Sequence, residues 1–356
     1  MSGEGRGHAT RVRAIVDALR DRHEIAIFAP GDAYELLAPA YANSEVRVEQ
    51  IPGLRFFYTP KNRLDFLKTG AMAARYSLRF RSLLKRLTAR LREGKPDLII
   101  TDFEPSLPRA AKRCGIPFIS LNHQHFLIVN DLSALPRDLR RHAAYMALVV
   151  RSYYSGMART IVSSFYFPPL KPQFKHVTQV GVILRPSVAN AVRSRRGHYV
   201  AYLRKFAPDT VLTALKSLGA PVYVYGLGER ASDENLSFKK ISEENFVNDL
   251  ASCEALISTA GNQLVGEALF LGKPVLAMPE HGNHEQFINA FFLREEETGD
   301  WLPLEKLDAA ALASFISKLP DFRQRIVPEK YNGTPLALDA IEQFLLDHSS
   351  GAGRKE

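Results

Sequence analysis

The chain has 356 residues, of which 46% are hydrophobic, and a formal net charge of +9. This length suffices for two hydrophobic cores, and no run of about 18 apolar residues is available to span a bilayer. Cys114 and Cys253 are the only cysteines, too few for a disulfide framework or a clustered zinc site, and the start lacks the pattern of a secretory signal. We expect a cytoplasmic protein of two domains without a bound metal.

The first half of the chain alternates helical and extended patterns. A glycine-rich turn at residues 3–8 opens a helix, and residues 24–29 then form an apolar strand. Further strands are predicted at residues 97–102 and 117–121, with a helix at residues 107–114 between them. Short apolar strands that alternate with helices are typical of a parallel sheet covered on both faces.

Only Met1 and Ser2 precede the first turn. In an open α/β sheet such a turn normally follows a strand, because ligands sit beyond the carboxyl ends of the strands. An empty central position in the sheet would leave buried backbone groups without hydrogen bonds. We therefore expect the first strand of this domain to be missing from the sequence, with a longer reading frame encoding it upstream; a domain with an incomplete sheet is the alternative.

The second half repeats the alternation. Strands are predicted at residues 199–203, 221–225, 255–258 and 274–278, and helices at residues 208–218, 243–252, 262–271 and from about Glu285. The fold class is therefore α/β, with two Rossmann-like, doubly wound parallel-sheet domains that face a cleft. We expect an N-terminal domain at residues 1–181, a C-terminal domain at residues 182–347 and a disordered tail at residues 348–356.

Basic residues are concentrated in the first half. Residues 1–181 contain 28 Lys and Arg against 15 Asp and Glu, whereas residues 182–356 contain 19 against 23. Much of the excess lies between Arg55 and Lys95, where basic and apolar residues interleave. A basic amphipathic helix is typical of a surface that meets anionic lipid or another polyanion, and a solvated helix face is the alternative. Nucleic acid is not an expected partner.

A second glycine-rich turn, Ser-Thr-Ala-Gly-Asn at residues 258–262, opens another helix. Such turns expose backbone N–H groups at the positive end of a helix, where phosphate is stabilised. Three segments, residues 3–11, 261–274 and 285–290, together resemble the corresponding segments of the GT-B nucleotide-sugar glycosyltransferases. Within that class the similarity is to the MurG-like and UDP-glucuronosyltransferase-like branch. The resemblance implies an acceptor site on the first domain and a nucleotide-sugar site on the second. It also implies inverting, hexosyl-type transfer to a hydroxyl, with no metal or other cofactor bound by the protein.

His8 is the candidate general base, because an imidazole accepts a proton near neutral pH and the turn directs it toward the predicted cleft. The resemblance implies the same role in inverting members. Asp102 and Glu104 follow the end of a predicted strand, and we expect them to orient His8 or to hold the acceptor. Capping of the following helix is the alternative for either one.

Further acceptor contacts are expected from the first domain. Gly5 and Gly7 belong to the first turn, and His123 and His125 follow the next strand. For these two histidines, acceptor contact is favoured over metal binding, since no third metal ligand is evident. A purely structural role for the pair is favoured over both.

The donor site is predicted on the second domain, with the diphosphate at the N-terminus of the helix after the second turn. The resemblance implies that Glu267 accepts hydrogen bonds from the ribose and that Glu285 and Gln286 contact the sugar. Phe246 is equally consistent with a core position. The predicted donor-binding residues are Gly226, Gly228, Phe246, Ser258, Thr259, Gly261, Asn262, Gln263, Glu267, Glu285 and Gln286.

A UDP-sugar is the expected co-substrate, and the acceptor is expected to carry a hydroxyl, with a lipid-linked molecule as one candidate. The basic helix makes an anionic membrane surface, at the inner face of the membrane, a further candidate partner. A nucleotide-sugar 2-epimerase of the same fold is the first alternative, although it would need more acidic residues and no acceptor. A non-catalytic polyanion-binding protein is the second, and it would leave Glu267 and Gln286 unexplained.

Overall fold

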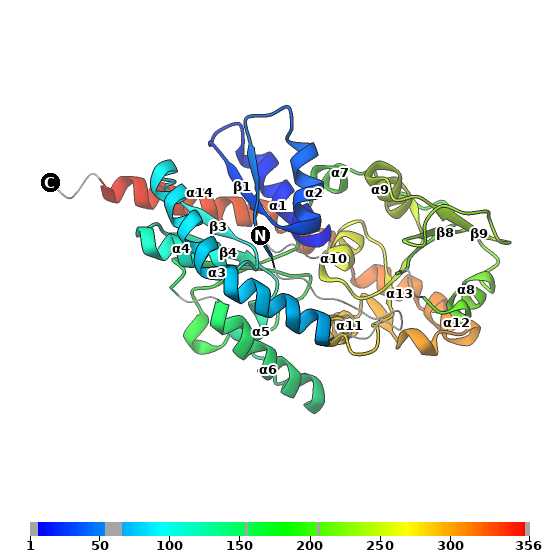
Figure 1. Ribbon diagram of the computed structural model, residues 1–356. Helices are drawn as coiled ribbons and strands as arrows, with labels where there is room; N and C mark the ends of the chain where they lie inside the picture. The colour runs from blue at the N-terminus through cyan, green and yellow to red at the C-terminus, as the bar shows by residue number, and fades with distance from the viewer. Residues whose placement is uncertain (1–5, 54–65, 154–155, 205–206, 353–356) are drawn as a thin grey trace.

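The computed structural model describes the backbone of residues 6–53, 66–153, 156–204 and 207–352, and the side chains of residues 7–53, 75–151, 156–204 and 207–348. Within these residues the chain forms two halves, each built on parallel strands with helices between them (Figure 1). This is the α/β architecture that the alternation of apolar strands and helices predicts.

The first half carries two short sheets. Its elements are α1 (Arg6–Leu19), β1 (Ala26–Ala29), α2 (Gly31–Ala40), β2 (Arg47–Gln50), α3 (Phe66–Gly94), β3 (Ile99–Thr101), α4 (Ser106–Cys114), β4 (Phe118–Asn122), α5 (Phe126–Val129), α6 (Arg137–Tyr153), β5 (Arg159–Ser163), the 3-10 turn η1 (Pro172–Phe174) and β6 (Thr178–Val180). Strands β1 and β2 pair in parallel, and β3, β4, β5 and β6 form a second parallel sheet in that order. Among the described residues β1 and β3 are edge strands, so one continuous sheet is not formed here.

The second half carries one parallel sheet of six strands in the order β12-β11-β10-β7-β8-β9. Its strands β10 and β11 are completely buried, as expected for parallel strands that helices cover on both faces. The elements are α7 (Pro186–Ala189), β7 (Tyr199–Tyr202), α8 (Asp209–Lys216), β8 (Val222–Tyr225), β9 (Leu236–Lys239), α9 (Glu243–Ser252), β10 (Leu256–Ser258), α10 (Asn262–Phe270), β11 (Val275–Ala277), α11 (His284–Glu295), β12 (Gly299–Trp301), η2 (Leu304–Lys306), α12 (Ala309–Ser317), α13 (Leu319–Arg325) and η3 (Pro328–Tyr331).

The last helix, α14 (Thr334–Ala352), runs back from the second half to the first (Figure 1). Its Ile341 and Phe344 are buried in one cluster with Ile15 of α1 and Val180 of β6. The helix therefore contributes to the core of the first half, although the expected boundary assigned residues 334–347 to the second domain. It also continues to Ala352, where a disordered tail was expected from residue 348.

The chain thus passes between the halves twice, and the two passages lie side by side. The N–H of Gly333 donates to the carbonyl of Val182 at 2.9 Å, and the N–H of Leu184 donates to Thr334 Oγ1 at 2.8 Å. A Cβ on Gly181 would lie 2.5 Å from the carbonyl oxygen of Tyr331, and one on Gly333 would lie 2.0 Å from the carbonyl oxygen of Gly181. Only glycine allows the two passages to approach this closely.

Candidate active site

The starts of α1 and α10 lie against each other where the two halves meet. A Cβ placed on Gly7 would lie 3.6 Å from the Cβ of Gln263, which is an ordinary van der Waals distance. Gly7 of the first glycine-rich segment is therefore a neighbour of Gln263, which directly follows the second turn, although more than 200 residues separate the two. Gly5 lies outside the described residues.

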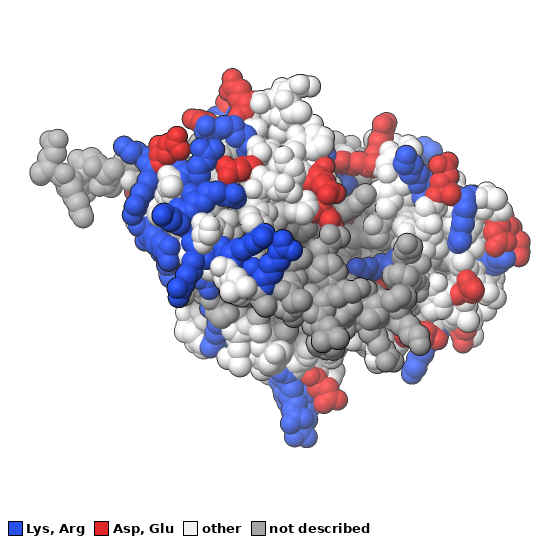
Figure 2. Space-filling model, in the orientation of Figure 1, with Lys and Arg blue, Asp and Glu red and all other residues white. Residues whose placement is uncertain are grey.

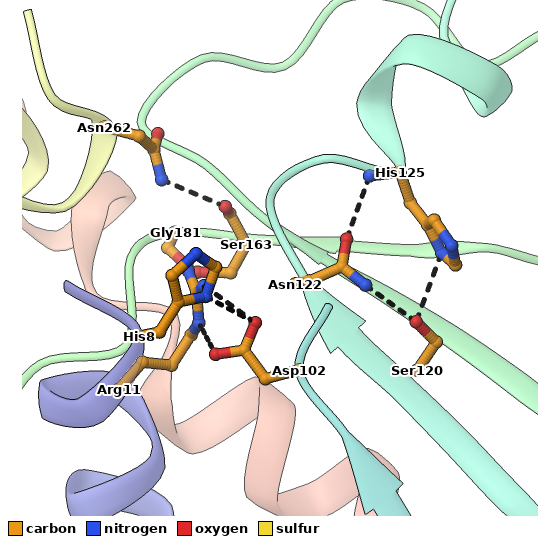
Figure 3. A network of polar contacts seen from close by, with 9 residues as sticks. All are labelled: His8, Arg11, Asp102, Ser120, Asn122, His125, Ser163, Gly181 and Asn262. Atoms are coloured by element: carbon orange, nitrogen blue, oxygen red, sulfur yellow. Dashed lines mark hydrogen bonds and ion pairs between the residues drawn. The ribbon is translucent and has the colours of Figure 1, made fainter. Parts of the chain in front are cut away.

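His8 and Asp102 form a hydrogen-bonded pair beside this contact. His8 Nδ1 lies 3.0 Å from Asp102 Oδ1 (Figure 3). Asp102 follows strand β3, and the next residue, Phe103, stacks on the His8 ring at a centroid distance of 6.4 Å. The His8 side chain is 15% exposed and that of Asp102 only 2%. The structure thus brings together the two residues that were expected to interact. Because Nδ1 contacts the carboxylate, the other ring nitrogen of His8, Nε2, points away from it.

Arg11 is the member of this cluster that sequence reasoning missed. Its Nε donates to Asp102 Oδ2 at 3.0 Å and its Nη2 to Asp102 Oδ1 at 3.0 Å. Burial by itself raises the pKa of Asp102, but the positive charge of Arg11, followed by that of His8, lowers it below the ordinary value for an aspartate. The spacing of His8 and Arg11 in the sequence could have indicated their proximity, because residues three apart on a helix share a face.

Glu104 does not orient His8. Its Oε1 accepts hydrogen bonds from the N–H and Oγ of Ser106 at 2.8 and 2.6 Å, and its Oε2 accepts one from the N–H of Leu107 at 2.8 Å. Both oxygens therefore satisfy donors at the start of α4, whose first N–H groups have no partner within the helix. The expectation of a role beside His8 is corrected in favour of the alternative, helix capping.

His123 and His125 are buried, with 2% and 1% of their surfaces exposed. His123 packs on Phe126 at a centroid distance of 4.7 Å, and its Nε2 lies 3.3 Å from Asn289 Oδ1. His125 Nδ1 lies 3.3 Å from the hydroxyl oxygen of Ser120. Desolvation lowers the pKa of His123 to about 3 and that of His125 to about 4. Both rings are therefore buried in the neutral form, which favours the structural pair over contact with an acceptor.

Glu267 is only 2% exposed, and both carboxylate oxygens already have partners. Arg185 Nη2 donates to its Oε2 at 2.9 Å, and Gln263 Nε2 donates to its Oε1 at 3.1 Å. Arg185 comes from the passage between the halves and was not foreseen as part of the site. A carboxylate offers about four acceptor positions, so Glu267 has capacity for further donors.

Gln286 and Glu285 occupy the start of α11. Gln286 is buried and holds the preceding loop, because its Oε1 accepts from the N–H of Glu280 at 2.8 Å and its Nε2 donates to Glu280 Oε2 at 3.2 Å. The Glu285 side chain reaches solvent, yet desolvation by its surroundings raises its pKa, against the opposing charges of His8 and Arg11. Glu285 is therefore close enough for the charges of His8 and Arg11 to act on its carboxyl group.

The remaining predicted donor residues have different environments. Phe246 is 5% exposed and lies between the rings of Tyr202 and Tyr225, which places it in the core and corrects its expected contact with the nucleotide. Asn262 Nδ2 donates to the carbonyl of Ser163 at 3.2 Å, so its side chain ties α10 to the first half (Figure 3). Gly226 has a φ of 91°, and a Cβ there would lie 1.8 Å from the carbonyl oxygen of Leu203.

The other turn residues lie around the start of α10. Ser258 is buried and its Oγ donates to the carbonyl of Thr259 at 3.0 Å, whereas Thr259 and Gly261 are partly exposed. Gly228 has a φ of 81° and lies in the exposed loop after β8. In the part of the chain that the structure describes, no group of three or more His, Cys, Asp or Glu is placed to hold a metal ion.

Solved structures that match this chain have the GT-B fold, and the chain shares that fold. The family model described as glycosyl transferase family 1 matches residues 1–320, and the chain belongs to this family. It is therefore a glycosyltransferase.

Three relatives illustrate the similarity. An uncharacterized glycosyltransferase of Methanosarcina acetivorans is 24% identical over 335 residues, which cover 85% of this chain and 84% of the relative. The structure of Phytolacca americana UGT2 complexed with UDP-2fluoro-glucose and pterostilbene matches with a TM-score of 0.67 and 12% identity over 91% of each chain. The structure of Acinetobacter baumannii MurG matches with a TM-score of 0.59 and 14% identity over 96% of this chain and 97% of that one.

Proposed function

We propose that this glycosyltransferase moves a hexose from a UDP-sugar to a hydroxyl of the acceptor, with inversion at the anomeric carbon. The observation that supports the proposal most directly is the His8–Asp102 pair, held at 3.0 Å beside the contact between the starts of α1 and α10. A base in one half and a phosphate-binding helix start in the other are the two parts that this reaction needs. UGT2 of Phytolacca americana, which has the same fold, is complexed with UDP-2fluoro-glucose.

In this reaction Nε2 of His8 removes the proton of the acceptor hydroxyl while the oxygen attacks the anomeric carbon. The bond between that carbon and the diphosphate oxygen breaks on the opposite face, which produces inversion. The electron pair leaves with the nucleoside diphosphate, and the proton remains on His8 until solvent takes it. Asp102 accepts the hydrogen bond of Nδ1–H and stabilises the imidazolium that forms.

The start of α10 receives the negative charge of the leaving diphosphate. Gly261 precedes the helix and has no side chain to cap it, so the first N–H groups of α10 remain for an anion. This donor set needs no metal ion and no resident cofactor in our proposal, because the nucleotide-sugar is a co-substrate. Glu285 and Gln286 are proposed to contact the sugar, and Glu267 the ribose.

Titration with a panel of nucleotides tests the donor assignment. We expect selective binding of UDP and UDP-sugars, and a loss of affinity of about 10- to 100-fold in Glu267→Gln, because hydrogen bonds to a charged group contribute about 1.5–3 kcal/mol. Isothermal titration calorimetry measures both. Equal affinity for all nucleotides, or no change in Glu267→Gln, contradicts the assignment.

Glu254→Gln is the matched control for this titration. Glu254 also pairs with arginine, Arg323 Nη2 lying 2.5 Å from its Oε2, but it precedes β10 and so lies at the opposite end of that strand from the turn. The substitution removes the same charge without touching the proposed site. We expect nucleotide affinity in this variant to equal that of the wild type.

The exposed face of α3 is the candidate contact with an anionic membrane surface. Its apolar residues Leu83, Leu87 and Leu91 pack inward against α4, so the helix presents its polar side to solvent. Figure 2 shows Lys and Arg side chains gathered on this face of the first half. Among the described side chains of α3, the exposed basic residues are Arg75, Arg79, Arg81, Lys85, Arg86, Arg90 and Arg92. Leu78 is 85% exposed within this group.

None of the described helices has the length and apolar content required to cross a bilayer. The basic residues of α3 would bind anionic headgroups electrostatically, at about 1 kcal/mol for each residue near the surface. A lipid-linked acceptor would then be met at the bilayer surface, next to the half that carries His8.

Co-sedimentation with vesicles tests this contact. We expect binding to phosphatidylserine-containing vesicles, little binding to phosphatidylcholine vesicles, and loss of binding when Arg79, Arg81, Lys85 and Arg86 are replaced by Gln. The matched control replaces four exposed basic residues of the second half, Arg196, Arg230, Lys306 and Arg325. Persistent binding in the first variant, or equal loss in both, contradicts a specific role for α3.

A further inference from the structure

Arg11, His8 and Asp102 place three polar atoms at hydrogen-bond distance from one another. Asp102 Oδ1 lies 3.0 Å from His8 Nδ1 and 3.0 Å from Arg11 Nη2, and these two nitrogens lie 3.1 Å apart. Arg11 Nε binds the other carboxylate oxygen at 3.0 Å. The guanidinium therefore grips both oxygens in the bidentate geometry that fixes a carboxylate most firmly, whereas His8 contacts only one of them.

The burial of this cluster makes its charges effective. The side chains of Arg11 and Asp102 are 4% and 2% exposed. A buried carboxylate next to an imidazole favours the protonated ring, because the opposite charges attract. The guanidinium of Arg11 keeps its charge at all ordinary pH values and lies as close to His8 Nδ1 as the carboxylate does. Arg11 therefore opposes protonation of His8 and offsets the effect of Asp102.

Other titratable groups face His8 from the neighbouring elements. Glu285 at the start of α11 is negative when ionised, and desolvation raises its pKa above the ordinary value. His123, after β4, has a pKa of about 3 because of burial and of the charge of Arg11, so it is neutral under working conditions. Asp102 and Arg11 are the two charged groups in direct contact with His8. Arg11 is thus the permanent positive charge that balances the carboxylates around His8.

We infer that Arg11 is a positioning residue of the transfer reaction, because its bidentate contact fixes Asp102 against His8 and its permanent charge opposes protonation of the imidazole that acts as the base. The inference deepens the proposed function, since it concerns the same base. Its physical consequence, the titration of His8, is measurable without donor or acceptor.

Nuclear magnetic resonance of histidine ring protons tests the inference, with the His8 signal assigned by its loss in His8→Ala. In Arg11→Met the carboxylate loses its compensating charge, so the imidazolium is stabilised. The titration midpoint of His8 is then expected to rise by about one pH unit or more, the size of effect that a charge at this distance produces. The acid limb of the pH profile of kcat/KM is expected to move upward by the same amount.

Further variants separate the charge from the geometry. Arg11→Lys keeps the charge and loses the bidentate grip, so we expect a midpoint near that of the wild type with a lower kcat. The double variant Arg11→Met with Asp102→Asn removes both charges, and its midpoint is expected to return toward the wild-type value. Arg20→Met is the control, because Arg20 is exposed near the end of α1 and pairs with Asp17; its midpoint is expected to be unchanged.

An unchanged His8 midpoint in Arg11→Met overturns the inference, whatever the activity of the protein. A purely structural Arg11 would lower thermal stability and leave the midpoint in place. If Arg11→Met does not fold, Arg11→Gln, which keeps polar contact with Asp102 but carries no charge, gives the same expected upward shift. A protein that titrates as expected but transfers no sugar from any nucleotide-sugar contradicts the proposed function and leaves the inference standing.

Discussion

Replacing His8 with Ala is expected to lower the rate of sugar transfer by about 10²- to 10⁴-fold, the usual contribution of a positioned general base. The loss should fall on kcat, because the donor is held by groups of the second half around α10. Donor affinity in calorimetry should therefore stay within about twofold of the wild type, which corresponds to less than 0.5 kcal/mol. Release of UDP from a UDP-sugar in the presence of acceptor measures the turnover.

His176→Ala is the control for this experiment, because His176 is an exposed histidine of the same half. Its turnover is expected to equal that of the wild type. Asp102→Asn is expected to reduce kcat as well, since an amide cannot stabilise the imidazolium as a carboxylate does. Full activity in His8→Ala would remove His8 from the role of base and with it the proposed mechanism.

The folded protein is expected to lose about 4 kcal/mol of unfolding free energy when the pH falls from about 7 to about 5. The cause is the burial of His123 and His125, whose pKa values are about 3 and about 4 in the folded state. In the unfolded chain both rings take up protons below about pH 6.5. The unfolded state thus binds more protons between about pH 6.5 and pH 4, and stability is lost as the pH falls through this window.

Urea unfolding at a series of pH values measures this loss. His125→Gln removes one of the two buried rings and is expected to reduce the loss between about pH 7 and pH 5 by about half, to about 2 kcal/mol. His176→Gln, at an exposed position, should leave the pH dependence unchanged. Stability that is constant from pH 7 to pH 5 in the wild type would show that the two rings are not buried in the neutral form.

Local patterns predict those parts of the fold in which one stretch of sequence determines its own structure. The apolar run at residues 97–102 appears as β3, and the stretch at residues 262–271 appears as α10. Strand β2 was not predicted, because its four residues form no apolar run: Val48 is the only hydrophobic one, and Arg47 and Glu49 flank it. The return of α14 to the first half was not foreseeable, since it depends on contacts between Ile341 and residues more than 150 positions away.

Some features of the candidate site could likewise be predicted from the sequence, and others could not. The position of Asp102 follows from the rule that ligands in an open α/β sheet lie beyond the carboxyl ends of the strands, since Asp102 comes directly after β3. The ion pairs of Arg11 and Arg185 were missed because an arginine is usually solvent-exposed, and only the distant carboxylate partner shows that Arg11 is buried and Arg185 half-buried. For the same reason the spacing of His123 and His125 gave no sign that both rings lie in the core.

The paired passages at Gly181 and Gly333 restrict how the two halves can move. A single connecting strand would let one half swivel about any of several bonds. Two strands joined by the hydrogen bond from Gly333 to Val182, with no room for a Cβ between them, must bend as one ribbon. A rotation of one half against the other would therefore have to bend both passages together, about an axis through this ribbon.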